Sequence, residues 1–234
     1  MAATSHHLPV RVRLFRWACR PLFRALYRLF SPIKITGLEN VPKRGAYIIV
    51  INHVSLFDAP FLLAFWPVAP EAVGAIEVWH RTGQSFLVRW YGGIPIRRGQ
   101  YNRRELQLLL SVLNAGRPLL IAPEGGRSHT PGLRRAFPGV AYLVEKSGVP
   151  VVPVGIVGAT DDYLRKALRA KRPPLEMHIG KPFRPDLGGV RGRLRGEARQ
   201  RLADQIMYQV AALLPPEYRG VYAEGILPSA EAGQ

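Results

Sequence analysis

The chain has 234 residues, of which 47% are hydrophobic, and its 33 Lys and Arg residues against 16 Asp and Glu residues give a formal net charge of +17. An intrinsically disordered protein is excluded, because this hydrophobic content supplies enough apolar side chains for a sizeable core. The single cysteine, Cys19, excludes an internal disulfide and a cysteine-cluster metal site. We expect no membrane-spanning helix, because no stretch approaches the roughly 18 consecutive apolar residues that one needs. The surplus charge leaves nucleic acid, an anionic membrane and an acidic protein or substrate open as partners.

Residues 10–30 have the spacing of an amphipathic helix, with arginines on one side and bulky apolar residues on the other. The arginines are Arg13, Arg16, Arg20, Arg24 and Arg28, and the apolar residues are Phe15, Leu22, Leu26 and Leu29. Such a helix suits a membrane interface, where apolar side chains enter the acyl boundary and arginines meet anionic headgroups. An ordinary surface helix, packed on the core by its Leu/Phe side, is the alternative, and Pro21 predicts a kink or a break in either case.

Strand-like and helix-like runs alternate beyond residue 31. Buried strands are predicted at residues 47–51, 94–96, 119–122 and 151–157, with a weaker candidate at 175–179, and helices at 59–65, 103–114, 139–146 and 196–214. This alternation predicts a mixed α/β fold with a largely buried β-sheet flanked by helices. We expect residues 1–30 to form the membrane-interface helix, residues 31–215 the main domain and residues 216–234 a C-terminal tail.

A histidine and an aspartate follow the first of these strands. Ligands of open α/β sheets bind at the carboxyl ends of the strands, and His53 and Asp58 lie five residues apart in the turn after residues 47–51. A neutral imidazole can take a proton from a hydroxyl, while a carboxylate on its other nitrogen fixes the tautomer and stabilises the imidazolium. The alternative is that Asp58 only caps the helix that begins at Ala59, or forms a capping box with Ser55.

Two other strand ends carry glycines and arginines. The loop 123–128 reads Pro-Glu-Gly-Gly-Arg-Ser, in which the glycines let the backbone approach a ligand and Arg127 offers a bidentate grip on phosphate. Glu124 is a candidate to bind a polyol or to hold Arg127, although a Gly-Gly turn flanked by charge is also a common surface loop. Arg97 and Arg98 follow the strand at 94–96. Because successive side chains of a strand point to opposite faces, at most one of these two arginines can face the site.

Taken in order, these segments resemble the four sequence blocks of the glycerolipid acyltransferase family, whose best-known members are the 1-acylglycerol-3-phosphate (lysophosphatidic acid) acyltransferases. The matches are His53 and Asp58 in the first block, Gly92 and Arg98 in the second, Pro123 to Ser128 in the third and Pro153 in the fourth. The sequence departs from the blocks at Arg97, where an acidic residue is common, and at Gly126, where threonine is usual. The resemblance extends from residue 34 to residue 185.

The resemblance implies an O-acyltransferase with a glycerol-3-phosphate acyltransferase-like fold. His53 would act as general base on a hydroxyl of lysophosphatidic acid or a related lysolipid, which attacks the thioester of acyl-CoA or acyl carrier protein, while Asp58 orients the histidine. By the same resemblance, the acceptor's glycerophosphate would be bound by Arg98, Glu124, Gly125 and Arg127. No metal and no cofactor is implied. The two departures leave the acceptor open, because both lie in blocks associated with acceptor binding.

From the implied lipid substrate and the basic first helix, we expect the protein to act at the cytoplasmic face of a membrane. We expect it to be peripheral or monotopic, with an anionic membrane surface as a partner. The remaining alternative is a non-catalytic basic protein that binds anionic lipid or nucleic acid. We expect no nucleic-acid partner, because the basic residues are not interleaved with aromatic residues as in a recognisable RNA or single-strand module. One further group of basic residues has no assigned task, namely Arg191, Arg193, Arg195, Arg199 and Arg201.

Overall fold

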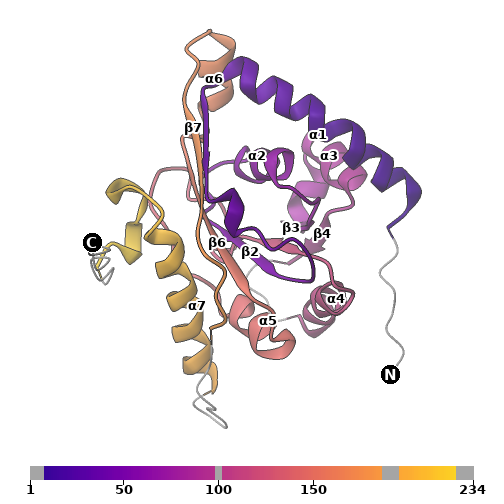
Figure 1. The fold of residues 1–234 in the computed structure, drawn as a ribbon, viewed down its shortest axis with the longest axis vertical. Coiled ribbons are helices and arrows are strands. Elements are labelled where there is room, and N and C mark those ends of the chain that lie inside the picture. The colour runs from indigo at the N-terminus through magenta and orange to yellow at the C-terminus, as the bar shows by residue number, and fades with distance from the viewer. Residues whose placement is uncertain (1–7, 98–101, 186–194, 225–234) are drawn as a thin grey trace.

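Seven strands form one sheet through the middle of the protein (Figure 1), in the order β1-β7-β6-β2-β5-β3-β4. The structure is a computed structural model that describes residues 8–97, 102–185 and 195–224. Neighbouring strands are parallel, except that β6 and β7 are antiparallel. The strands are β1 (Ile33–Thr36), β2 (Ile48–Ile51), β3 (Glu71–Ala75), β4 (Ile94–Ile96), β5 (Leu119–Ile121), β6 (Val151–Val157) and β7 (Leu175–Ile179).

Helices cover both faces of this sheet, as Figure 1 shows. One core cluster joins residues of α1, α2 and α6 to one face, and a second joins residues of α4, α5 and α7 to the other. This arrangement confirms the predicted mixed α/β fold with a buried sheet flanked by helices. The helices are α1 (Val10–Phe30), α2 (Asp58–Phe65), α3 (Gln84–Tyr91), α4 (Arg103–Asn114), α5 (Gly139–Ser147), α6 (Tyr163–Leu168) and α7 (Arg195–Ala211).

The central strand β2 explains why the sheet is recognisable in the sequence. Ile48 and Val50 pack into the cluster beside α4, α5 and α7, whereas Ile49 and Ile51 pack into the cluster beside α1 and α2. Successive side chains of a strand point to opposite faces, so a strand that is covered on both faces must be apolar at every position. All four residues are at most 2% exposed.

Two strands and two helices were not predicted. The strand β3 begins with the charged residue Glu71 and contains Gly74, so its composition does not indicate a buried strand. Glu71 is nevertheless fully buried, because Arg16 of α1 and Arg117 of the loop before β5 both pair with its carboxylate. The other elements that were missed are β1, α3 and α6, which are short or only partly buried.

The first helix exposes the leucines that were expected to face a membrane, but part of its arginine side faces the protein, and it does not pack on the core by its Leu side. Residues 10–30 do form one amphipathic helix, and Pro21 lies inside it. Three of the five arginines face the protein, whereas Arg13 and Arg28 are exposed. Arg16 is 3% exposed, and the guanidinium groups of Arg20 and Arg24 donate hydrogen bonds to backbone carbonyls of Trp66 and Ala64 at the end of α2. These arginines therefore attach α1 to the domain and do not meet solvent or headgroups as a stripe.

The segment after α7 also packs on the domain. Tyr218 and Tyr222 are buried, and the hydroxyl of Tyr222 donates to Asp204 of α7 while it accepts the backbone N–H of Ala136. Residues 216–224 are thus attached to the core.

The basic group at residues 191–201 has structural partners where the structure describes it. Arg195 and Arg199 both pair with Glu145 of α5. Arg191 and Arg193 lie outside the described residues.

Candidate active site

His53 and Asp58 lie at the carboxyl end of β2 and contact each other. The Nδ1 atom of His53 is 3.0 Å from Oδ2 of Asp58, and their side chains are 22% and 1% exposed. Because Nδ1 is engaged by the carboxylate, the lone pair of Nε2 is left for a ligand hydroxyl. The two residues therefore have the geometry of a general base and the group that orients it.

The contacts of Asp58 include those of the capping-box alternative. Helix α2 begins at Asp58 itself, which does not fit a simple N-cap, but Oδ2 accepts the backbone N–H of Ser55 at 2.8 Å and the Ser55 hydroxyl accepts the N–H of Phe57 at 3.1 Å, as in a capping box. The same Oδ2 also contacts His53, so the capping role and the orienting role are compatible. Burial raises the pKa of Asp58, and the hydrogen bond from His53 opposes that rise. The carboxylate thus holds the turn and the histidine, and the turn brings the pair together within six residues of sequence.

Glu124 fixes the backbone of the histidine. One carboxylate oxygen accepts the N–H of His53 and the other accepts the N–H of Arg134, each at 2.8 Å. The side chain is 1% exposed, and burial raises its pKa to about 7 although the two backbone donors favour the charged form. Both oxygens that the sequence analysis expected to bind an acceptor are engaged within the protein.

Gly125 and Arg127 lie on the wall of a cavity that also includes His53. Gly125 has φ +67°, and a Cβ there would lie 2.6 Å from the ring of Phe137, so only glycine fits. Arg127 is 16% exposed and directs one guanidinium nitrogen to Asp161, at 3.3 Å. Arg97 also lines this cavity, whereas Arg98, which the sequence analysis expected to bind phosphate, lies outside the described residues.

Two features of this region were not found from the sequence. His129 and Asp161 form a second pair, with His129 Nδ1 2.6 Å from Asp161 Oδ2. Asn52 bonds twice to the backbone of Ile156, donating to its carbonyl and accepting from its N–H, and so ties the end of β2 to β6. Asp161 is 34 residues from Arg127, and Asn52 is 104 from Ile156, so periodicity gave no signal for either contact.

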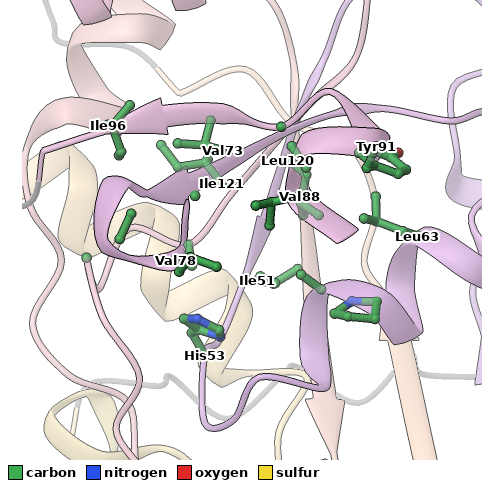
Figure 2. Close-up of a pocket in the computed structure, with 18 of the residues that line it drawn as sticks. Ile51, His53, Leu63, Val73, Val78, Val88, Tyr91, Ile96, Leu120 and Ile121 are labelled. Atoms are coloured by element: carbon green, nitrogen blue, oxygen red, sulfur yellow. The ribbon is translucent and has the colours of Figure 1, made fainter. Parts of the chain in front are cut away.

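The cavity beside His53 has a volume of about 490 Å³, within the range of small-molecule sites. Its walls are mostly apolar, and Figure 2 shows His53 at one margin of the labelled lining residues. The labelled apolar residues come from the sheet, from α2, from α3 and from the 3₁₀ turn after β3, and they are Ile51, Leu63, Val73, Val78, Val88, Ile96, Leu120 and Ile121. The geometry thus places a proton acceptor next to space for an apolar chain.

The described residues hold neither a metal-binding cluster nor a membrane-spanning helix. Within the described part of the chain, no group of three or more His, Cys, Asp or Glu side chains is placed to hold a metal ion. None of the helices described is long and apolar enough to cross a membrane.

The chain is similar in sequence to known acyltransferases. Residues 32–157 match the model of the family described as Acyltransferase. The chain is 30% identical over 209 residues to the lyso-ornithine lipid O-acyltransferase of Pseudomonas aeruginosa. This alignment covers 82% of this chain and 78% of that protein. It is 28% identical over 162 residues to a 1-acyl-sn-glycerol-3-phosphate acyltransferase of Limnanthes douglasii, covering 66% of this chain and 56% of that protein.

A solved structure gives the same result for the fold. The crystal structure of the 1-acyl-sn-glycerophosphate (LPA) acyltransferase of Thermotoga maritima matches with a TM-score of 0.59 at 26% sequence identity, over 83% of this chain and 79% of that one. The family match includes β2 with His53 and Asp58, β5 with the loop 123–128, and β6. The family model, the relatives and the fold therefore agree, and the chain belongs to the Acyltransferase family.

Proposed function

We propose that this chain transfers a fatty acyl group from an acyl thioester, either acyl-CoA or acyl carrier protein, to a hydroxyl of lysophosphatidic acid or a related lysolipid. The observation that carries the proposal is the His53–Asp58 pair at the margin of an apolar cavity. The named relatives support an O-acyl transfer to a lysolipid, because one is described as acting on lyso-ornithine lipid and another on 1-acyl-sn-glycerol-3-phosphate.

The reaction needs one proton acceptor and one hydroxyl. Nε2 of His53 takes the hydroxyl proton while the oxygen attacks the thioester carbonyl carbon, which forms the new C–O bond. Collapse of the tetrahedral intermediate breaks the C–S bond, and the imidazolium returns the proton to the leaving thiolate. Asp58, which is 3.0 Å from Nδ1, stabilises the imidazolium between these two steps.

The cavity is the proposed place of the acyl chain. Its lining is mostly apolar and runs from His53 to residues of α1 and α3, so an acyl chain in it would keep its thioester beside Nε2. Burial of each methylene stabilises the bound chain by about 0.8 kcal/mol. The donor is a substrate in this scheme, and its own chemistry is the thioester.

The loop 123–134 is the proposed site of the acceptor headgroup. Arg127 is on the cavity wall and offers a guanidinium to a phosphate or a carboxylate. Gly125 keeps the backbone close to this wall, since a larger residue would meet Phe137. Glu124 acts as a positioning residue, because its oxygens hold the backbone of His53 and of Arg134.

Membrane association is proposed through the outer side of α1. With Arg16, Arg20 and Arg24 against the domain, the helix exposes large apolar side chains. These are Val10, Leu14, Trp17, Leu22, Leu26 and Leu29. Phe86 and Trp90 of α3 are also exposed, and both rings contact Phe15 of α1, with centroids 6.1 and 5.9 Å from it. Adjoining exposed apolar surface on two helices is typical of insertion into a membrane interface.

The experiment that tests the proposal is acyl transfer by the purified full chain with acyl-CoA or acyl carrier protein and a panel of lysolipids. His53→Ala and Asp58→Asn should each lower kcat by at least about a hundredfold while liposome binding is retained. The matched control is His178→Ala, because His178 also pairs with an acid, Glu176, but lies on β7 away from the cavity.

Two results would contradict the proposal. Retention of most of the activity in His53→Ala would exclude the proposed base. Absence of transfer to every lysolipid, with salt-sensitive binding of nucleic acid or anionic lipid instead, would favour the non-catalytic alternative.

A further inference from the structure

Three neighbouring parallel strands end at the same edge of the sheet, and the loops that follow them carry side chains of different charge. In the sheet, β2 lies between β6 and β5, and all three run in the same direction. The loop after β2 carries His53, the loop after β5 carries Arg127 and His129, and the loop after β6 carries Asp161. Because carboxyl ends of parallel strands meet at one edge of the sheet, these side chains share one site.

Backbone hydrogen bonds fix this group beside the histidine. The N–H of Ser128 donates to the carbonyl of His53 at 2.9 Å, and the N–H of His129 donates to the carbonyl of Val54 at 3.1 Å. The two residues that follow Arg127 are therefore bonded to the turn that carries the base. A headgroup held at Arg127 would lie next to the reacting hydroxyl.

Asp161 gives this site a negative group that ligands can reach. Its carboxylate contacts Arg127 Nη1 at 3.3 Å and His129 Nδ1 at 2.6 Å, and its side chain remains 40% exposed. The other two carboxylates near His53, those of Asp58 and Glu124, are at most 1% exposed and are engaged by protein donors. Among these three carboxylates, Asp161 is thus the one that a ligand's cation can reach.

We propose that Arg127 and Asp161 form a headgroup site for a zwitterionic lysolipid, with the ligand's carboxylate on Arg127 and its ammonium on Asp161. The inference rests on the proposed function, and it names the class of acceptor. A guanidinium binds a carboxylate with two parallel hydrogen bonds, and an ammonium donates to a carboxylate in a charge-assisted hydrogen bond. His129 is a positioning residue here, since it holds the second oxygen of Asp161.

The same arrangement disfavours an acceptor whose headgroup is only anionic. Such a headgroup would compete with Asp161 for the guanidinium of Arg127 and would meet the carboxylate at short range. Selectivity of this kind commonly depends on a repulsive group as well as an attractive one. The amine-bearing headgroup satisfies both charges, whereas lysophosphatidic acid satisfies one and opposes the other.

Activity of the full-length protein with three acceptors distinguishes the contact of the ligand's ammonium with Asp161 from the contact of its anionic group with Arg127. They are a lyso-ornithine lipid, the same lipid with its side-chain amine acetylated, and lysophosphatidic acid. We expect the native enzyme to favour the free amine over the acetylated form by about tenfold in kcat/KM, the size of one charge-assisted hydrogen bond. Asp161→Asn should abolish this preference and raise kcat/KM for lysophosphatidic acid.

Asp162→Asn is the matched control, because it removes the same charge one residue along the chain. The carboxylate of Asp162 is directed to Thr160 and Lys166 and has no contact with Arg127 in the described interactions. This variant should keep the native order of acceptors. Unchanged thermal unfolding of both variants would show that the exposed substitutions leave the fold intact.

Each other outcome overturns the assignment. If Asp161→Asn lowers kcat/KM equally for all three acceptors, Asp161 only positions Arg127. If the native enzyme favours lysophosphatidic acid, the acyltransferase proposal stands and the zwitterion site falls. Transfer to none of the acceptors contradicts the proposed function itself, and the headgroup assignment falls with it.

Discussion

Arg16 of the first helix and Glu71 of strand β3 form a two-point ion pair in the interior. Nη1 lies 3.0 Å from Oε1 and Nη2 lies 2.7 Å from Oε2, with side chains that are 4% and 0% exposed. Burial raises the pKa of Glu71, but Arg16 and Arg117 more than offset that effect and hold the pKa below its usual value. The pair joins a helix near the N-terminus to the interior of the sheet.

Removal of Arg16 should destabilise the protein strongly. Arg16→Leu leaves the carboxylate of Glu71 buried with Arg117 as its remaining partner, and the loss of one member of a buried pair costs about 3 kcal/mol. Arg13→Leu is the control on the same helix, because Arg13 is exposed and should change the free energy of unfolding by less than about 0.5 kcal/mol. Urea unfolding of both variants measures the difference, and equal effects would show that the pair does not anchor α1.

The stability contributed at Glu124 should depend on pH. Its folded-state pKa is raised to about 7, so the folded protein binds a proton between the usual glutamate range and pH 7 that the unfolded chain has released. The free energy of unfolding of the native protein, minus that of Glu124→Gln, should therefore fall by roughly 2–3 kcal/mol from pH 5 to pH 8.

Urea unfolding of the two proteins at both pH values measures this quantity. The matched control is Glu197→Gln, which removes a carboxylate that is 72% exposed on α7. A difference between native protein and Glu124→Gln that does not change with pH would mean that the buried carboxyl titrates in its ordinary range.

The outer side of α1 should carry the attachment to membranes. Trp17→Glu places a charge on the most exposed large apolar residue of the helix, which is 78% exposed, and should lower partitioning to anionic liposomes by tenfold or more. Val221→Glu is the control, since Val221 is 62% exposed but lies in the C-terminal segment on another side of the molecule (Figure 1). Liposome sedimentation measures both, and equal partitioning would locate the contact elsewhere.

The cavity should set the length of acyl chain that the enzyme accepts. Val88 of α3 lines the cavity among the labelled residues of Figure 2, so Val88→Phe should fill part of it. We expect kcat/KM for long-chain donors to fall by about tenfold or more, because each methylene that is excluded loses about 0.8 kcal/mol, while short-chain donors are less affected. A donor series of increasing length measures this, with Val221→Phe as control, and a uniform loss at every length would argue against an acyl site.

Local pattern was sufficient for most elements and for the proposed catalytic pair. The strands at 47–51, 94–96, 119–122, 151–157 and 175–179 were predicted and are present as β2, β4, β5, β6 and β7, because buried strands need continuous apolar runs. His53 and Asp58 belong to one turn, so their contact depends on few residues of chain. The strand β3 was missed because a buried glutamate such as Glu71 needs ion-pair partners, and these, Arg16 and Arg117, lie far from it in the sequence.

By itself, the sequence determined the α/β fold, the amphipathic first helix and the closeness of His53 to Asp58, since each depends on neighbours along the chain. Only the tertiary structure decided which way α1 faces: a stripe of arginines is the same in sequence whether it meets lipid headgroups or the carbonyls of Ala64 and Trp66. It also decided what surrounds Arg127, because Asp161 comes from another strand end. Contacts between distant segments depend on how the strands are ordered in the sheet, and no local periodicity encodes that order.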